Sequence, residues 1–289
     1  MKDENAIVIE AWNTVLFEKF SRFRHLVTKG LSGHGDVLLQ RHPIAGGSRV
    51  LDVGCGFGDT TQQIALAVGP SGTAVGVDCA ANFIEVATRE AREAGLAQAS
   101  FFAGDVQFAP LGGPYDRVFS RFGTMFFNLP GAALRNIRRS LAPGALATFI
   151  VWRKREDNPW LFAAEQTVRK IVPVVSHEQT NEVHCGPGPF AWAGADTVSE
   201  LLLSSGFQRV SLERCDLEIC IGRDLSEAVE LSMTLGPSGE ILRLAGAEGE
   251  RLRGQVVEAL KQTLKQFERA DGSGIWAPSS TWFVSARNP

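Results

Sequence analysis

The chain has 289 residues, 44% of them hydrophobic, and its 29 basic and 32 acidic residues give a formal net charge of −3. This length and hydrophobic content suit one large α/β domain with a sizeable core and exclude a largely disordered chain. The lack of a basic excess argues against nucleic acid as a partner, because binding to a phosphate backbone depends on Lys and Arg.

The N-terminal segment carries acidic residues where a signal peptide would carry positive charge. No apolar run approaches the ~20 residues that span a bilayer, so we expect a cytoplasmic protein without a membrane span. Within residues 5–24, apolar side chains recur at helical spacing, which predicts one or two amphipathic helices packed on a main domain.

From residue 49 to residue 152, strand and helix patterns alternate, which indicates right-handed βαβ units and a parallel sheet. The predicted strands are RVLDVG (49–54), TAVGVD (73–78), ASFFAGD (99–105), YDRVFSRF (115–122) and ALATFIVW (145–152). The predicted helices cover about 59–68, 81–94 and 131–142, and we expect Pro143 and Gly144 to close the last of them.

After Arg153 the pattern changes to a helical stretch ending near Ile171 and then a segment rich in Pro and Gly. A helix (195–206), an edge strand (207–221), an amphipathic helical region broken at GPSG, and a closing strand (280–288) follow. We predict N-terminal helices in 1–44 that form part of a cap, and one ligand-binding domain in 45–289. Its cap insertions lie at about 154–194 and 224–271, and they form either a moving lid or a dimer interface.

The stretch VLDVGCGFG, residues 50–58, has three alternate glycines after a strand. A dinucleotide fingerprint needs its third glycine where Asp59 stands, and the carboxylate of Asp52 would repel a pyrophosphate. S-adenosylmethionine (AdoMet) has no phosphate and carries an ammonium and a sulfonium. Gly54, Gly56 and Gly58 would allow its methionine tail a close backbone approach, and Asp52 would pair with the ammonium directly or through water. The alternative is a tight turn that binds nothing.

Two further carboxylates follow strands. Asp78 is placed to accept both ribose hydroxyls, and Asp105, beside the backbone of Val106, to accept from the adenine amino group. Cys79 and Phe83 could pack on the adenine. The structural alternatives are a helix cap for Asp78, a loop cap for Asp105 and core packing for the other two side chains.

The motifs VLDVGCGFG, GVD, FFAGDVQ, YDRVFSRFGTMFF and LAPGALATFIVWR resemble, in order, those of the class I AdoMet-dependent methyltransferases. The resemblance is closest to the branch that includes the ubiquinone/menaquinone C-methyltransferases and many small-molecule methyltransferases. It is strong over about 45–153 and holds only in outline for the last two strands. It implies a Rossmann-like, seven-stranded, mostly parallel sheet with an antiparallel last strand, AdoMet at the carboxyl ends of the first strands, and substrate above the fourth and fifth.

Missing motifs narrow the substrate class. No Asn-Pro-Pro-aromatic tetrad follows the fourth strand, which argues against amino groups of nucleobases and glutamine as substrates. No cluster of two aspartates and an asparagine has the spacing of the magnesium-dependent catechol enzymes. Five cysteines without a CxxC pair do not indicate a zinc ribbon, so we expect no metal.

Methyl transfer mainly requires alignment of the nucleophile and exclusion of water, with a base where a proton must leave. His177 or His184 is a candidate base, unless both are solvated loop residues. Arg121 could position an anionic substrate or simply form a salt bridge. Ser120, also after the fourth strand, is assigned to the cofactor site. Candidates for the substrate pocket, unless they are ordinary core, are Trp12, Arg121, Met125, Trp152, Trp160 and Phe190.

We therefore expect AdoMet-dependent methyl transfer to oxygen, carbon or nitrogen of a small lipophilic or aromatic metabolite, by a monomer or homodimer. Two alternatives stay open. An NAD-type oxidoreductase would use a similar sheet but is disfavoured by Asp52 and Asp59. A non-catalytic AdoMet-binding accessory protein would lack an enclosed substrate pocket.

Overall fold

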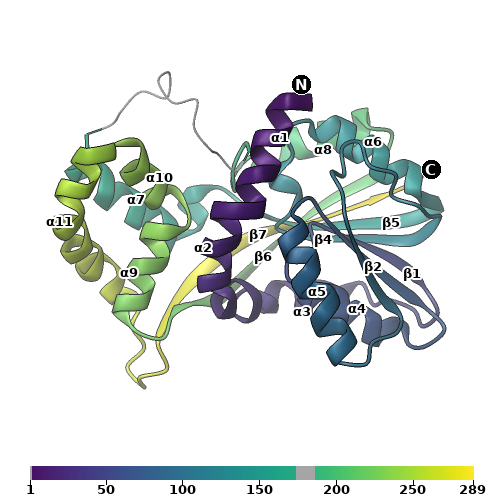
Figure 1. The fold of residues 1–289 in the computed structure, drawn as a ribbon, viewed down its shortest axis with the longest axis horizontal. Coiled ribbons are helices and arrows are strands. Elements are labelled where there is room, and N and C mark those ends of the chain that lie inside the picture. The colour runs from purple at the N-terminus through teal and green to yellow at the C-terminus, as the bar shows by residue number, and fades with distance from the viewer. Residues whose placement is uncertain (1, 174–185) are drawn as a thin grey trace.

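The computed structural model describes residues 2–173 and 186–289, and a seven-stranded sheet of order β3-β2-β1-β4-β5-β7-β6 organises them (Figure 1). The strands are β1 (Arg49–Val53), β2 (Thr73–Asp78), β3 (Ala99–Ala103), β4 (Tyr115–Arg121), β5 (Leu141–Trp152), β6 (Gln208–Gly222) and β7 (Ile275–Arg287). Strands β1 to β5 pair in parallel, whereas β7 is antiparallel to both β5 and β6. The predicted Rossmann-like sheet with an antiparallel last strand is confirmed.

Helices cover both faces of this sheet. On one face α3 (Ser32–Arg41) and α4 (Asp59–Val68) bury Leu38 and Ile64 against Val50 and Phe119. On the other, α6 (Pro130–Ser140) and α8 (Ala195–Ser204) bury Leu134 and Leu202 against alternate residues of the same strands. Helix α5 (Ala81–Glu93) follows β2 and packs beside β3. Two-sided burial explains why these strands are nearly continuous apolar runs.

The predicted boundary between the helix before Pro143 and the fifth strand is wrong, and the closing strand begins at Ile275, before the predicted residue 280. Pro143 and Gly144 do not close the helix before them, because α6 ends at Ser140 and β5 begins at Leu141. The pairing register with β4 shifts between Tyr115 and Arg117, opposite the Pro-Gly pair, and Gly144 has a φ of +76°. Proline lacks the ladder N–H, so the pair marks an irregularity at the start of a strand.

The N-terminal segment contains α1 (Lys2–Ala11), α2 (Phe17–Arg22) and two π-helical stretches, Trp12–Leu16 and Leu26–Gly30. Short 3₁₀ turns occupy Thr124–Phe126, Arg155–Asp157 and Lys265–Phe267. In Figure 1, α1 and α2 cross the middle of the molecule, between the sheet and a helical bundle. Contacts run from this segment to both sides: Asn82 of α5 donates to the Asn13 carbonyl at 2.6 Å, and Arg22 pairs with Glu230 of α9 at 2.6 Å.

The bundle at the left of Figure 1 consists of α7 (Pro159–Ile171), α9 (Leu225–Thr234), α10 (Pro237–Leu244) and α11 (Gly246–Leu264). These helices come from the two segments predicted as cap insertions. Helix α7 packs on α10 and α11, and the hydroxyls of Thr167 and Thr263 lie 2.8 Å apart across that contact. Within the described residues, no helix combines the length and apolar character that crossing a membrane requires.

Candidate active site

A cavity of about 1200 Å³ lies where the carboxyl ends of β1, β2 and β4 meet the N-terminal helices and the bundle. It brings together most residues predicted for the cofactor and substrate sites: Trp12, Gly54, Gly56, Asp78, Cys79, Phe83, Asp105, Val106, Arg121, Met125, Trp152, Trp160 and Phe190. Parallel strands present their carboxyl ends at one edge of a sheet, which explains why residues far apart in sequence meet there.

The glycines of the first loop have different tasks. A Cβ on Gly58 would lie 2.7 Å from the Cβ of Ala87 and 2.8 Å from the Phe101 ring, so this glycine permits α4 to pack beside α5 and β3. Gly58 therefore faces protein and does not line the cavity. At Gly56, by contrast, φ is +51° and an added Cβ would meet no atom within 4 Å. Gly56 thus leaves an open backbone cradle on the cavity wall.

Asp78 is fixed by backbone donors at the end of β2. Its Oδ2 accepts from the Gly56 N–H at 3.0 Å, and its Oδ1 accepts from the Ala80 N–H at 3.0 Å. Burial raises the pKa of this carboxyl, and the two N–H donors oppose that rise. Asp78 does not cap α5, whose N-cap is Ala80 without a side-chain cap bond; its carboxylate instead ties the loop after β2 to the glycine loop, and it lines the cavity as well.

Asp105 links the loop after β3 to the N-terminal helix. Its Oδ1 accepts from the backbone N–H and the side-chain amide of Gln107, both at 3.0 Å, and its Oδ2 accepts from Asn5 of α1. Asn5 in turn accepts from Asn128 at 2.9 Å. The loop-cap contact is present. The sequence analysis missed Gln107, which is two residues from Asp105, and Asn5, which is 100 residues from it.

The side chain of Arg121 is nearly buried, at 9% exposure, and forms an ion pair with Asp59. Asp59 is the residue that replaces the third glycine of a dinucleotide fingerprint. This ion pair agrees with the alternative that Arg121 forms a salt bridge. Both side chains also line the cavity. The next residue, Phe122, has a φ of +60° and stacks on Trp152 with ring centroids 4.4 Å apart. A bulky residue with positive φ is a strained position of the kind that gathers at functional sites.

The chain's similarities agree with this geometry. Residues 50–144 match the family model described as a methyltransferase domain. The ubiquinone/menaquinone biosynthesis C-methyltransferase of Pseudomonas aeruginosa is 25% identical over 174 residues, which cover 58% of this chain and 68% of that protein. Nocamycin O-methyltransferase of Saccharothrix syringae is 30% identical over 181 residues, covering 60% and 64%. A Bacillus halodurans structure classed as a methyltransferase has a TM-score of 0.56 at 17% identity, covering 88% of this chain and 98% of its own.

Residues 50–144 form an AdoMet-dependent methyltransferase domain, and the sheet has the class I methyltransferase fold. The family model covers the strands that carry the glycine loop, Asp78 and Asp105, whereas the bundle lies outside it. The methyltransferase therefore combines a domain that the family model matches with a helical bundle that it does not match. Together the similarities support methyl transfer from AdoMet to a small molecule.

The residues on the cavity wall of this methyltransferase fit AdoMet. Gly56 offers the open backbone that a Cβ would fill, and Asp78 is a carboxylate held at the end of β2. Arg121 is paired with Asp59, and Arg24, which lies over the Phe57 ring of the loop, is paired with Glu90, so neither guanidinium is free to bind a pyrophosphate. A cationic, phosphate-free ligand suits this charge pattern.

Besides Gly58, the predicted cofactor residues Asp52 and Ser120 do not line the cavity. Asp52 is 1% exposed and its Oδ2 accepts from Thr61 of α4 at 2.6 Å, because alternation along β1 directs this side chain toward α4. Burial raises the pKa of the Asp52 carboxyl to about 7. Any pairing with a ligand ammonium would be indirect. Ser120 is wholly buried and donates to the Val53 carbonyl at 2.6 Å, so it ties β4 to β1.

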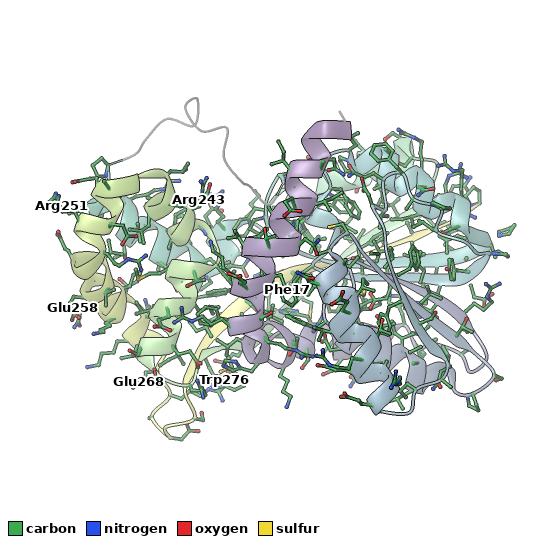
Figure 2. The ribbon with its side chains drawn as sticks, in the orientation of Figure 1. Phe17, Arg243, Arg251, Glu258, Glu268 and Trp276 are labelled. Atoms are coloured by element: carbon green, nitrogen blue, oxygen red, sulfur yellow. The ribbon has the colours of Figure 1, made fainter. Side chains whose placement is uncertain are left out.

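Aromatic side chains form much of the wall and also belong to the core. Phe83 is 3% exposed and contacts Phe57 and Phe17 with ring centroids 4.8 Å and 5.0 Å apart. Figure 2 shows Phe17 between α2 and α5. Trp12 meets Phe126 edge-on at 5.0 Å, and buried Met125 accepts from the Trp152 N–H at 3.4 Å. The same aromatic side chains can therefore pack in the core and line the cavity.

His177 and His184, the candidate bases, lie outside the described residues. Within 2–173 and 186–289, no three His, Cys, Asp or Glu side chains form a group that could hold a metal ion. Cys55, Cys79, Cys215 and Cys220 are free thiols.

Proposed function

We propose that the protein transfers the methyl group of AdoMet to oxygen, carbon or nitrogen of a small lipophilic or aromatic metabolite by in-line displacement. The observation that carries the proposal is the continuity of one cavity from the Gly56 loop to the aromatic side chains Trp152, Trp160 and Phe190. Two of the similar proteins are named as a C-methyltransferase and an O-methyltransferase, which supports carbon or oxygen as the acceptor atom.

AdoMet, when bound, supplies a methyl group already activated by its sulfonium. The chain's task is then to hold two ligands in line and to keep water away. Asp78 would accept the ribose hydroxyls, Asp105 and Val106 would contact the adenine, and the backbone at Gly56 would lie along the methionine tail. Trp12, Met125 and Trp152 would pack on the substrate and exclude water.

The cofactor assignment is tested by Gly56→Val. A branched side chain there would fill the open cradle, so we expect AdoMet affinity to fall below detection in calorimetry while thermal unfolding stays cooperative. Gly95→Val is the matched control, because Gly95 also has a positive φ of +69°, has open space around its Cβ position and lies outside the cavity. Wild-type AdoMet affinity in Gly56→Val would contradict the proposal.

The reaction is tested with methyl-deuterated AdoMet and an extract of the host. We expect one small lipophilic or aromatic compound to gain the labelled methyl group with the wild-type protein and not with Gly56→Val. A labelled nucleic acid or protein, without any labelled metabolite, would contradict the proposed substrate class.

A further inference from the structure

Glu165 of α7 is a buried carboxylate on the cavity wall. It is 2% exposed, and its Oε1 takes all of its hydrogen bonds: from Arg155 at 2.9 Å and from the Nε and Nη2 of Arg169 at 3.0 Å and 2.8 Å. Its Oε2 is equally buried and has no partner among the residues that the structure describes. Buried charged oxygens are nearly always hydrogen-bonded, so an acceptor left over on a cavity wall indicates a missing donor.

Trp160, on the same helix, has an unpaired hydrogen-bond donor. Its side chain lines the cavity, the residue is 8% exposed, and its Nε1 donor has no acceptor in the described part of the chain. Five residues separate it from Glu165, or about 7.5 Å along a helix axis. The cavity wall on α7 thus carries one unused donor and one unused acceptor at two separate points.

The charges around Glu165 restrict what can donate to it. Arg155 and Arg169 both contact the carboxylate, so the three groups together carry one excess positive charge. The two guanidinium groups would repel a substrate ammonium, and the free carboxylate oxygen would repel an anion. A neutral hydroxyl satisfies Oε2 without either penalty.

These groups lie away from the cofactor loop. Trp152 stacks on Phe122 just after β4, and Trp160 meets Trp152 edge-on with ring centroids 6.4 Å apart. This aromatic path leads from the strand ends to α7, with Glu165 farther along the helix. A substrate whose reacting atom lies near the loop would direct its far end toward α7.

Building on the proposed function, we propose that the substrate is oxygenated at the end remote from the methylated atom. Glu165 Oε2 accepts a hydrogen bond from a neutral hydroxyl of the substrate, and Trp160 Nε1 donates to a substrate oxygen such as a carbonyl or ether. Both residues are positioning groups. They select substrates by oxygen pattern within an otherwise apolar cavity, since a buried polar group left unpaired is costly.

The test uses two probes with the same ring system and oxygen positions, 2,6-dihydroxynaphthalene and 2,6-dimethoxynaphthalene, titrated by calorimetry in the presence of S-adenosylhomocysteine. The hydroxyl probe can donate to Oε2 and the methoxy probe cannot. We expect the wild-type protein to prefer the hydroxyl probe by roughly tenfold or more, as for a hydrogen bond to a charged group. Equal affinities, or failure of the hydroxyl probe to bind, would overturn the inference.

Glu165→Gln directs an amide at the two arginines and the cavity in place of a carboxylate. We expect the ratio of the two affinities to shift toward the methoxy probe, because an amide N–H can donate to an ether oxygen. If Glu165 had a purely structural role, the substitution would lower the affinity for both probes by the same factor. An unchanged ratio of the two affinities would therefore also overturn the inference. Glu258→Gln is the matched control, since Glu258 pairs with Lys261 and lies on the outer side of the bundle (Figure 2).

Trp160→Phe keeps an aromatic ring, removes the donor together with part of the indole and leaves the ion pairs in place, so it tests the inference even if Glu165→Gln fails to fold; naphthalene controls for the lost ring volume. We expect it to lower the affinity for both oxygenated probes while binding of unsubstituted naphthalene stays the same. Binding of S-adenosylhomocysteine is measured in every variant. Its absence in the wild-type protein would refute the proposed function, whereas normal binding with unaltered probe selectivity would refute only this inference.

Discussion

Asp78 has structural contacts that leave it able to make the proposed contact with the ribose. Its two oxygens accept the N–H groups of Gly56 and Ala80, yet a carboxylate has lone pairs left for two further donors. These backbone contacts and the proposed contact with a ligand are therefore compatible. The contacts with the loop also keep the carboxylate in a single orientation before any ligand arrives.

We expect Asp78→Asn to weaken AdoMet binding by about 1.5 to 3 kcal/mol, since the change removes a charge-assisted acceptor from the ribose but keeps the side-chain shape. Calorimetry measures the effect. Asp116→Asn is the control, because Asp116 also accepts a backbone N–H, from Arg49 at 2.7 Å, at the opposite edge of the sheet. Equal affinity in the Asp78 variant and the wild-type protein would place the ribose elsewhere.

Helix α3 is tied to β7 by a buried histidine. His34 is 0% exposed, and its Nε2 and Nδ1 lie 2.8 Å and 3.1 Å from the hydroxyls of Ser279 and Thr281. Burial, with a smaller contribution from Arg121, lowers the pKa of His34 from 6.5 to about 4. The folded protein therefore holds this imidazole neutral.

Because the pKa of His34 is lower in the folded protein than in the unfolded chain, the stability falls as the pH falls. Above pH 6.5 His34 is neutral in both states, so its contribution to stability is complete. Between pH 6.5 and about 4 only the unfolded chain gains the proton. We expect a loss of about 3 kcal/mol of unfolding free energy across that window, measured by denaturant titration.

The buried Asp52 carboxyl, with its pKa raised to about 7, acts in the opposite direction in the same range. The difference between the wild-type protein and His34→Gln isolates the histidine, because glutamine keeps hydrogen-bonding capacity and does not titrate. If the two proteins show the same dependence on pH from 4 to 6.5, His34 is not the source.

At the scale of the whole molecule, the cavity is enclosed by three segments distant in sequence: the N-terminal helices, α7, and α9 with α10. The N-terminal helices reach both halves, through Asn5 to Asp105 and through Arg22 to Glu230. The second contact is an exposed ion pair, which contributes little stability. This weak attachment suits a segment that moves relative to the bundle when ligands enter.

We expect hydrogen exchange to show added protection in α1, α9 and α10 when S-adenosylhomocysteine binds, because closure over the ligand would exclude water from these helices. Exchange is measured with and without ligand at two protein concentrations. Protection that depends on protein concentration alone would favour a dimer interface and contradict a lid.

Local patterns were sufficient for the first half of the chain. Alternating apolar runs and helical periodicity predicted β1 to β4 closely, and α4 was predicted as about residues 59–68, the range that it occupies. The alternate glycines and Asp59 argued for a ligand without phosphate. Such features depend on residues close together in sequence, so the sequence alone was sufficient to predict the sheet and the methyltransferase domain.

Only the tertiary structure decided which side chains share the cavity. Alternation along β1 placed Asp52 against α4, and the irregular start of β5 absorbed Pro143 and Gly144. In the sequence, Glu165 is visible only as a charged residue on the apolar face of α7. Its two arginine contacts and its unpaired oxygen are seen only in the structure. Whether a side chain is buried, and which side chain it pairs with, depends on which distant segments of the chain pack together. Spacing along the sequence does not give that information, because the free energy of packing is shared across the whole molecule.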